Sequence, residues 1–182
     1  MIKYRMLALF VVLVLLATGV AVGQNAYMKG NNAIHAGIGF GMAGVYGSST
    51  LPPITVGYEY GFEEKISLGG VLGYSGSKET FGGFGEWTYT YIIIGARGGY
   101  HFLENNPDLD AYAGLMLGYN IVSSSASTVN TGFGSFSASA SGSYMIFGIY
   151  GGARYYFNPN LAVYGELGYG LGFFNVGVAY KL

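Results

Sequence analysis

The sequence predicts an all-β protein, an eight-stranded antiparallel up-and-down transmembrane β-barrel. Three observations lead to this prediction: an apolar composition with few charges, period-two alternation in eight segments, and connections that alternate between short and long. Of the 182 residues, 51% are hydrophobic, 9% are charged and 33 are glycine. Soluble domains average about 25% charged residues. A surface that faces lipid instead of water would explain the deficit.

The first residues have the pattern of a secretory signal peptide. Lys3 and Arg5 give a short positive start, residues 6–16 are apolar, and small residues follow up to Gly23, where the Ala-Val-Gly sequence 21–23 fits a cleavage site. We therefore expect two regions, a signal peptide at 1–23 and an outer-membrane β-barrel domain at 24–182. The alternative is a membrane helix that is retained, but residues 6–22 are at the short limit for spanning a bilayer.

The first four expected strands lie at residues 34–40, 53–62, 65–74 and 90–102. In each of them, residues alternate between an apolar face and a face of glycine or polar side chains. This period of two residues is that of a strand whose two faces have different surroundings. The second face includes His35, Glu59, Ser67 and Arg97. The apolar faces are formed by Ile34, Ala36, Ile38 and Phe40; Ile54, Val56, Tyr58 and Tyr60; Ile66, Leu68, Leu72 and Tyr74; and Thr90, Ile92, Ile94, Ala96, Tyr100 and Phe102.

The last four expected strands lie at residues 110–121, 145–157, 161–169 and 174–182. Their glycine-rich faces hold Asp110, Arg154, Glu166 and Lys181. A soluble sandwich would turn its apolar face inward and its charges to water, and a soluble sandwich with a signal peptide is the rival fold. An Arg or Lys that faces lipid at mid-depth costs about 2–4 kcal/mol. Because the charges keep to the glycine-rich face, the sequence favours a barrel with lipid outside and a narrow packed interior.

The tripeptide Leu-Gly-Tyr recurs at 72–74, 117–119 and 167–169, and each copy ends a strand. Each follows a short turn that comes after a pair of aromatic residues. The pairs are Tyr60 and Phe62, Tyr100 and Phe102, and Tyr155 and Phe157. The repeat unit is therefore a hairpin with outward aromatic residues at both ends. Two girdles of interfacial aromatic residues have this layout, although high strand propensity alone would also enrich tyrosine.

The connections alternate in length. Residues 63–64, 103–108 and 158–160 are expected short turns, and residues 42–52, 75–89 and 123–142 are expected longer loops. Outer-membrane barrels have short periplasmic turns and longer extracellular loops, so both termini should be periplasmic. The Ser/Gly/Ala stretch 123–143 resembles a linker. Alternation persists at 135–141, which favours an extended hairpin that protrudes outside.

The inward charges predict an ion-pair network in the lumen, formed by Glu59, Arg97, Arg154 and Glu166. Arg154 and Glu166 fall on neighbouring strands about one diagonal step apart, roughly 7–8 Å. An eight-stranded barrel has an interior that side chains just fill, and an unpaired buried charge is costly. We favour a plug that satisfies the core over a gate or an ion path.

His101 and Asp110 flank one expected turn and form a possible pair at the periplasmic rim. The sequence places no serine near either histidine, so we expect no enzyme. Two distant histidines do not make a metal site, and neither of the glycine-rich stretches 37–41 and 95–99 opens a helix, as a nucleotide loop would. We expect no cofactor. The chain has no cysteine and a net charge of −1 without a basic run, so we expect no nucleic acid as a partner.

Aromatic residues in the expected outer loops are candidates for contact with a ligand. Loops often carry contacts, but these rings could equally lie at the interface or pack the loops. The candidates are Tyr46, Phe81, Phe84, Trp87, Phe133 and Phe136.

Taken together, the signal peptide, the eight amphipathic segments, the G-x-x-Y-x-F motif before a turn, the Leu-Gly-Tyr motif and the final segment 175–182 resemble the small OmpX/OmpA-like outer-membrane barrels, the porin-family β-barrel domain. The resemblance implies an outer-membrane location, contact with outer-membrane lipid, assembly by the barrel-assembly machinery, and an unknown extracellular ligand. The expected role is structural or a surface interaction through outer loops. The alternative is a narrow porin-like channel for small or apolar solutes. The family usually ends in phenylalanine, whereas this chain ends in Leu182.

Overall fold

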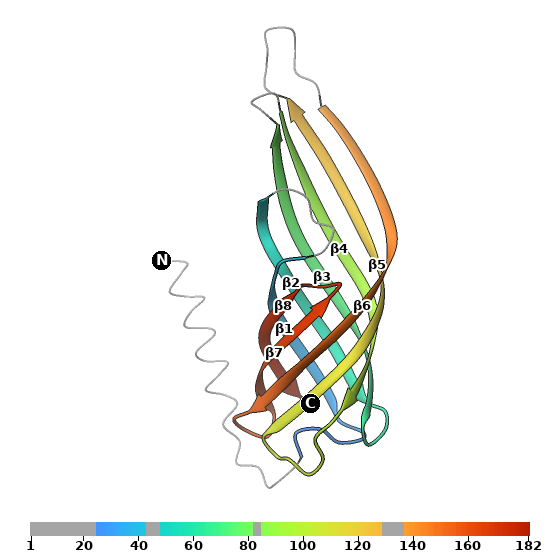
Figure 1. The fold of residues 1–182 in the computed structure, drawn as a ribbon, viewed down its shortest axis with the longest axis vertical. Coiled ribbons are helices and arrows are strands. Elements are labelled where there is room, and N and C mark those ends of the chain that lie inside the picture. The colour runs from blue at the N-terminus through green and yellow to red at the C-terminus, as the bar shows by residue number, and fades with distance from the viewer. Residues whose placement is uncertain (1–24, 43–47, 82–84, 129–136) are drawn as a thin grey trace.

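A computed structural model describes residues 25–42, 48–81, 85–128 and 137–182, which form a closed barrel of eight antiparallel strands (Figure 1). Each strand pairs with its neighbours in the sequence, and β1 pairs with β8 to close the barrel. The predicted fold class is confirmed. The strands are β1 (Asn32–Phe40), β2 (Ser48–Gly61), β3 (Ile66–Phe81), β4 (Gly85–His101), β5 (Leu109–Thr128), β6 (Ser137–Tyr156), β7 (Leu161–Tyr169) and β8 (Phe174–Lys181). Within the described ranges, no helix is long and apolar enough to cross a membrane.

Two of the short turns are built around an asparagine side chain. Asn158 Oδ1 accepts hydrogen bonds from the backbone N–H groups of Asn160 and Leu161, at 3.0 and 2.8 Å. Asn106 Oδ1 accepts hydrogen bonds from the backbone N–H groups of Asp108 and Leu109, at 3.1 and 2.9 Å. Asparagine forms such turns because its short side chain reaches the backbone two or three residues on. Strand alternation therefore stops at these asparagines.

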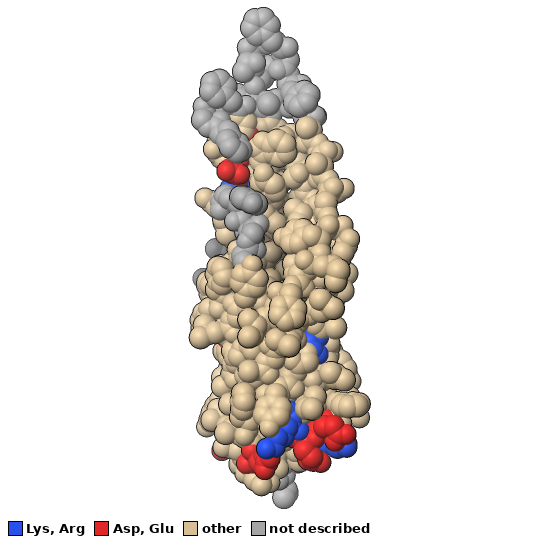
Figure 2. All heavy atoms as spheres, turned by 45° about the vertical axis from the view of Figure 1, so that its right-hand side comes forward, with Lys and Arg blue, Asp and Glu red and all other residues tan. Residues whose placement is uncertain are grey.

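The outer surface of the barrel is apolar, and the polar side chains point inward. Ile38, Phe147 and Leu167 are 47%, 61% and 65% exposed, whereas Arg154 and Glu166 are buried. Because successive side chains of a strand point to opposite faces, the alternation in the sequence becomes this inside-out arrangement. Figure 2 shows a long wall with few charges, and the acidic and basic side chains in that view gather mainly at one end. Such a surface suits lipid as the surrounding solvent.

The two ends of the barrel differ. At the end that we call the turn end lie the connections 62–65, 102–108 and 157–160 and the described termini (Figure 1). Exposed aromatic residues ring this end, among them Phe62, Tyr100, Phe102, Tyr155 and Phe157. A second set of exposed aromatic residues comprises Phe40, Tyr74, Tyr119, Tyr169 and Phe174. The paired Phe40 and Phe174 of β1 and β8 stack with ring centroids 6.2 Å apart.

At the opposite end, β3 to β6 continue well past the other strands (Figure 1). We call this part the extension, residues 76–81, 85–91, 122–128 and 137–144. The prediction of a loop at 75–89 is wrong, because β3 and β4 stay paired to Phe81 and Gly85. The loop predicted at 42–52 is also shorter, since β2 begins at Ser48. The extended hairpin in 123–143 is confirmed for its described residues, which pair as far as Ser127 and Ser137.

The reason for these longer strands lies in their side chains. Beyond the apolar wall, the outward residues are mainly serine and threonine, with the pair Lys78 and Glu86, and all of these tolerate water without breaking a strand. β6 pairs with β7 only from Ile149 to Tyr156. Among the described residues, no strand therefore pairs with the β7 side of β6 over residues 137–144.

Candidate functional site

Two ion pairs cross the lumen. Arg154 on β6 donates to Glu59 on β2 through both terminal nitrogens, at 2.6 and 2.7 Å. Arg97 on β4 donates to Glu166 on β7 at 2.6 Å. The paired side chains are 12% exposed or less. The lumen is therefore spanned by short, buried and charge-assisted hydrogen bonds, the strong class of such bonds.

Tyrosine rings complete the surroundings of both arginines. The guanidinium of Arg97 lies 3.6 Å from the centre of the Tyr150 ring, and that of Arg154 lies 4.6 Å from the centre of the Tyr112 ring. Tyr112 also donates to Glu166 Oε2 at 3.3 Å. A Cβ atom on Gly114 would run into the Tyr150 ring, so glycine at this inward position leaves room for the ring. The glycine-rich face thus makes space for large side chains.

The four predicted lumen residues are thus joined in two pairs, and each pair crosses the barrel. Arg154 lies opposite Tyr164 and Glu166 lies opposite Gly152, so Arg154 and Glu166 are diagonal neighbours, as the spacing predicts. Their charges nevertheless pair with groups on other walls. Long side chains in a narrow lumen can reach across it, which a two-strand count does not reveal.

His101 and Asp110 lie together at the turn end, with His101 Nδ1 2.7 Å from Asp110 Oδ1. The other ring nitrogen, Nε2, lies 3.0 Å from Ser67 Oγ. The expectation that no serine lies near a histidine is wrong. Ser67 faces inward on β3 opposite Gly99, one diagonal step from His101, and the hairpin register is the signal that could have found it.

The Ser67–His101–Asp110 chain has the hydrogen-bond order of a nucleophilic triad. Acyl transfer also requires room beside the nucleophile for a substrate and for donors to an oxyanion. All three residues are about 1% exposed, and Asp110 Oδ2 lies 3.6 Å from Arg154. The arrangement therefore ties three strands together in a sealed place, and it does not present a serine to a substrate.

The segment before β1 covers this cluster. The ring of Tyr27 stacks on His101 with centroids 3.6 Å apart and planes 8° apart, and its hydroxyl donates to the Ile66 carbonyl at 2.6 Å. Burial raises the pKa of the Tyr27 hydroxyl above its ordinary value, so it stays a neutral donor. Lys29 bonds Glu63 at 2.7 Å. This segment, residues 25–31, closes the turn end of the lumen.

His35 lies on β1, buried against Tyr164 with ring centroids 5.8 Å apart in an edge-on arrangement. Neither of its ring nitrogens has a hydrogen-bond partner among the described residues. Within the same residues, no group of three or more His, Cys, Asp or Glu could hold a metal ion. The chemistry of the lumen is thus that of ion pairs and hydrogen bonds.

Of the predicted loop contacts, Phe81 is the last residue of β3 and Trp87 belongs to β4, so neither is in a loop. Tyr46, Phe84, Phe133 and Phe136 lie outside the described residues. Trp87 stacks on Tyr89 with ring centroids 6.4 Å apart. The aromatic residue at 87 is thus part of a strand face of the extension.

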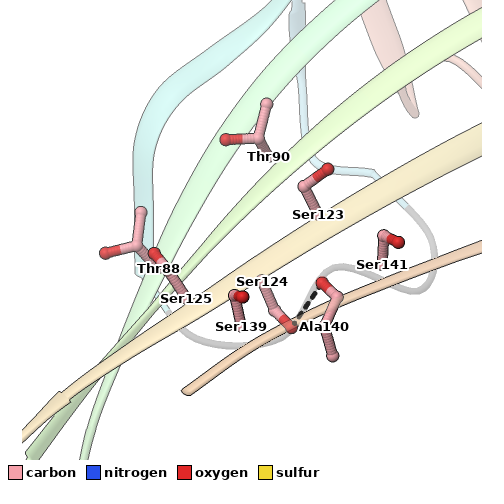
Figure 3. Close-up of a pocket in the computed structure, with 8 residues that line it drawn as sticks. All are labelled: Thr88, Thr90, Ser123, Ser124, Ser125, Ser139, Ala140 and Ser141. Atoms are coloured by element: carbon pink, nitrogen blue, oxygen red, sulfur yellow. Dashed lines mark hydrogen bonds between the residues drawn. The ribbon is translucent and has the colours of Figure 1, made fainter. Parts of the chain in front are cut away.

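The extension also has a hydroxyl-rich face, where β4, β5 and β6 form a hollow of about 350 Å³ (Figure 3). Ser124 donates to the Ala140 carbonyl at 3.2 Å and so links β5 to β6. The lining residues are Thr88, Thr90, Ser123, Ser124, Ser125, Ser139, Ala140 and Ser141.

No protein-family model and no curated protein sequence matches this chain. Solved structures do. The attachment invasion locus protein Ail of Yersinia pestis matches with a TM-score of 0.58 and 16% identity, over 85% of this chain and 100% of that one. The N-terminal β-barrel domain of Pseudomonas aeruginosa OprF matches with a TM-score of 0.56 and 16% identity, over 86% and 100%. Ail in complex with the heparin analogue sucrose octasulfate matches with a TM-score of 0.56 and 17% identity, over 85% of this chain and 100% of that one. The predicted likeness to small OmpX/OmpA-type barrels is thus confirmed for the fold.

Proposed function

We propose that this chain is an outer-membrane β-barrel protein that makes contacts outside the cell through the extension, with a lumen that is closed. The observation that carries the proposal is the difference between the two ends of the barrel. The lumen is filled by crossed ion pairs, whereas four strands project well beyond the apolar wall. A sheet that rises out of the membrane has two faces and an edge to offer to other molecules.

The location follows from the surface. The outward apolar side chains need lipid, and a closed barrel leaves no unpaired backbone within it. Because such barrels have short periplasmic turns and longer extracellular parts, the turn end and both termini belong in the periplasm. The signal peptide at 1–23 would direct export. The last strand, β8, and Leu182 after it are the part that the barrel-assembly machinery would recognise.

Two observations support a surface role over the narrow channel. The first is the lumen, where four charges are used in pairs and the segment 25–31 covers the turn end. The second is β6, whose edge over residues 137–144 has no partner strand in the described chain. An exposed strand edge is a template for pairing with another chain.

The solved neighbours narrow the choice of ligand. Ail binds sucrose octasulfate, a polyanion, and such ligands need basic groups. In this chain the extension has one described basic residue, Lys78, and it is paired with Glu86 at 2.7 Å. We therefore do not extend the heparin-analogue ligand to this protein.

The test compares cells that display the full chain with cells that display a shortened one, in which tight turns replace 76–91 and 122–144. Heat-modified gel mobility checks that both barrels insert. We expect the shortened protein to insert normally and to lose attachment to matrix proteins and to other cells. Equal attachment by both proteins would contradict the proposal.

A further inference from the structure

A row of aromatic rings follows the inner face of the extension. Trp87, Tyr89 and Tyr91 are alternate residues of β4, so their side chains share one face. Successive ring centroids are 6.4 Å apart, with planes 19° and 25° from parallel. The three rings therefore form a continuous stack that leads from the extension toward the mouth of the lumen, where Tyr91 is buried.

This stack borders a hollow of about 620 Å³, within the roughly 300–1,000 Å³ of small-molecule sites. We call it the tyrosine hollow. Three tyrosines from two strands contribute to its wall, together with small and hydroxyl-bearing residues. The lining residues are Tyr89, Tyr91, Val122, Ser124, Ala140, Ser141, Gly142, Ser143 and Tyr144.

A buried polar group next to the tyrosine hollow has an unused acceptor. Asn120 is 1% exposed and lies opposite Tyr144, on the inward face of β5. Its amide nitrogen donates to the Tyr144 hydroxyl at 2.9 Å, but its Oδ1 atom has no partner among the described residues. Buried acceptors are nearly always paired. Asn120 is not among the lining residues, so its part at the hollow is to hold the Tyr144 hydroxyl in place.

Hydroxyl groups continue around the site. The tyrosine hollow shares Ser124, Ala140 and Ser141 with the hydroxyl-lined hollow of Figure 3. A serine or threonine hydroxyl can both donate and accept a hydrogen bond. The tyrosine hollow thus combines aromatic rings with the hydroxyl groups of Ser124, Ser141 and Ser143.

Charge is nearly absent from this region. Lys78 and Glu86 neutralise each other, and Glu79 is the remaining charged residue of the described extension. An anionic ligand would meet net negative charge, and an acyl chain would leave the hydroxyl groups without hydrogen-bond partners. The chemistry of the site therefore matches a neutral molecule with many hydroxyl groups.

We propose that the tyrosine hollow binds a neutral carbohydrate, with a sugar ring stacked on the tyrosines and sugar hydroxyls bonded to Ser124, Ser141 and Ser143. The inference rests on the proposed surface function, for which it names the ligand class. Pyranose rings have apolar C–H faces and polar rims, so they fit a site with aromatic walls and hydroxyl edges.

The chain carries its own probe, because Trp87 is its single tryptophan and stacks on Tyr89 of the hollow. The mature chain in lipid nanodiscs would be titrated with neutral oligosaccharides of the maltose, cellulose, chitin and galactan series, with tryptophan fluorescence as the readout. Heparin fragments and lauric acid are the comparison probes. We expect a saturable change with at least one neutral series and none with the comparison probes.

Variants locate the binding. Ser124→Ala should weaken the affinity about tenfold, the loss of one good hydrogen bond, and Tyr144→Ala should weaken it at least as much. Thr80→Ala is the matched control, since Thr80 is exposed on β3 of the extension and lines neither hollow. It should leave the affinity for the neutral oligosaccharide unchanged.

No saturable change in tryptophan fluorescence with any of the four neutral series would overturn the inference. A change with lauric acid alone or with heparin fragments alone would also overturn it. The wild-type titration decides this even if a variant fails to fold. The attachment test with the shortened chain separates the two proposals. If shortening abolishes attachment while no sugar binds, the surface function stands and the carbohydrate inference fails.

Discussion

At the scale of single residues, each lumen arginine holds one carboxylate and lies over one tyrosine ring. Arg154 bonds Glu59 with both nitrogens and lies near Tyr112. Removing one member of a buried pair leaves the other charge without compensation, which costs about 3–5 kcal/mol, whereas replacing both by apolar residues is often neutral. Each ion pair therefore compensates two charges that would otherwise be buried unpaired in a narrow lumen, and it need not add net stability.

Replacing one residue of the Glu59–Arg154 pair should lower the free energy of unfolding more than replacing both. Arg154→Met leaves Glu59 buried and unpaired, and we expect it to lower the free energy of unfolding by about 3–5 kcal/mol. Glu59→Leu combined with Arg154→Met should recover much of that loss. Urea unfolding of the refolded proteins in detergent, followed by tyrosine and tryptophan fluorescence, measures both. Equal stability of the single variant and the wild type would contradict this account of the lumen.

Ser67 should be unreactive despite its position in a hydrogen-bonded Ser–His–Asp chain. Because Ser67, His101 and Asp110 are sealed from solvent, we expect a fluorophosphonate probe to leave the folded protein unlabelled. The control is a soluble serine hydrolase in the same detergent. Labelling that Ser67→Ala abolishes would instead identify an active nucleophile in the barrel.

The sequence was sufficient to assign the inward residues, because alternation decides which side of a strand a residue occupies. It did not identify the partners. Arg154 and Glu166 are diagonal neighbours on β6 and β7, yet each bonds a residue across the lumen. Pairing across a closed barrel depends on its diameter and stagger, which local spacing does not contain. The proximity of Ser67 to His101 follows from the register of the β3–β4 hairpin, in which Ser67 lies opposite Gly99. Alternation within a single strand does not contain that register.

At the scale of elements, the segment 25–31 acts as a cover for the turn end. It is held by the Tyr27 stack on His101, by a hydrogen bond from the Ala26 N–H to the Asn106 carbonyl at 2.7 Å, and by one from Lys181 Nζ to the Asn25 carbonyl at 3.0 Å. None of this could be read from the sequence, since the segment has no alternation.

Removing the Tyr27 ring should uncover the histidine beneath it. We expect Tyr27→Ala to increase the rate at which diethylpyrocarbonate modifies His101 at least several-fold, as followed by mass spectrometry of the digested protein. Lys29→Ala is the matched control on the same segment. Its salt bridge to Glu63 is solvent-exposed, and exposed pairs contribute little. Equal rates for wild type and Tyr27→Ala would show that the segment does not cover the site.

The strands were predictable where the apolar contrast is strong and underestimated where it is weak. Residues 90–102 have bulky outward side chains, and that prediction agrees with the inner part of β4. Residues 85–89 have small or polar side chains on one face, so the sequence predicted a loop there. Backbone pairing nevertheless continues there, because a hairpin that is already in register adds ladder hydrogen bonds for each further pair.

At the scale of the whole molecule, the protein is a barrel with one end shut and one end drawn out into a sheet (Figure 1). The apolar wall requires a membrane, the ion pairs fill the lumen, and the extension projects beyond the apolar wall. The position in a membrane and the filling of the lumen follow from the composition and the alternation. The shape of the extension emerges only from the strand register.

The central claim, that the lumen is closed, is tested most directly by the ion conductance of the refolded chain, residues 24–182, in a planar bilayer. The account predicts a protein that inserts, as judged by heat-modified gel mobility, and that gives no discrete current steps. Glu166→Ala, which frees Arg97, should be the variant in which steps first appear. Reproducible steps from the wild type would mean that the charges line an open path, and would contradict the account.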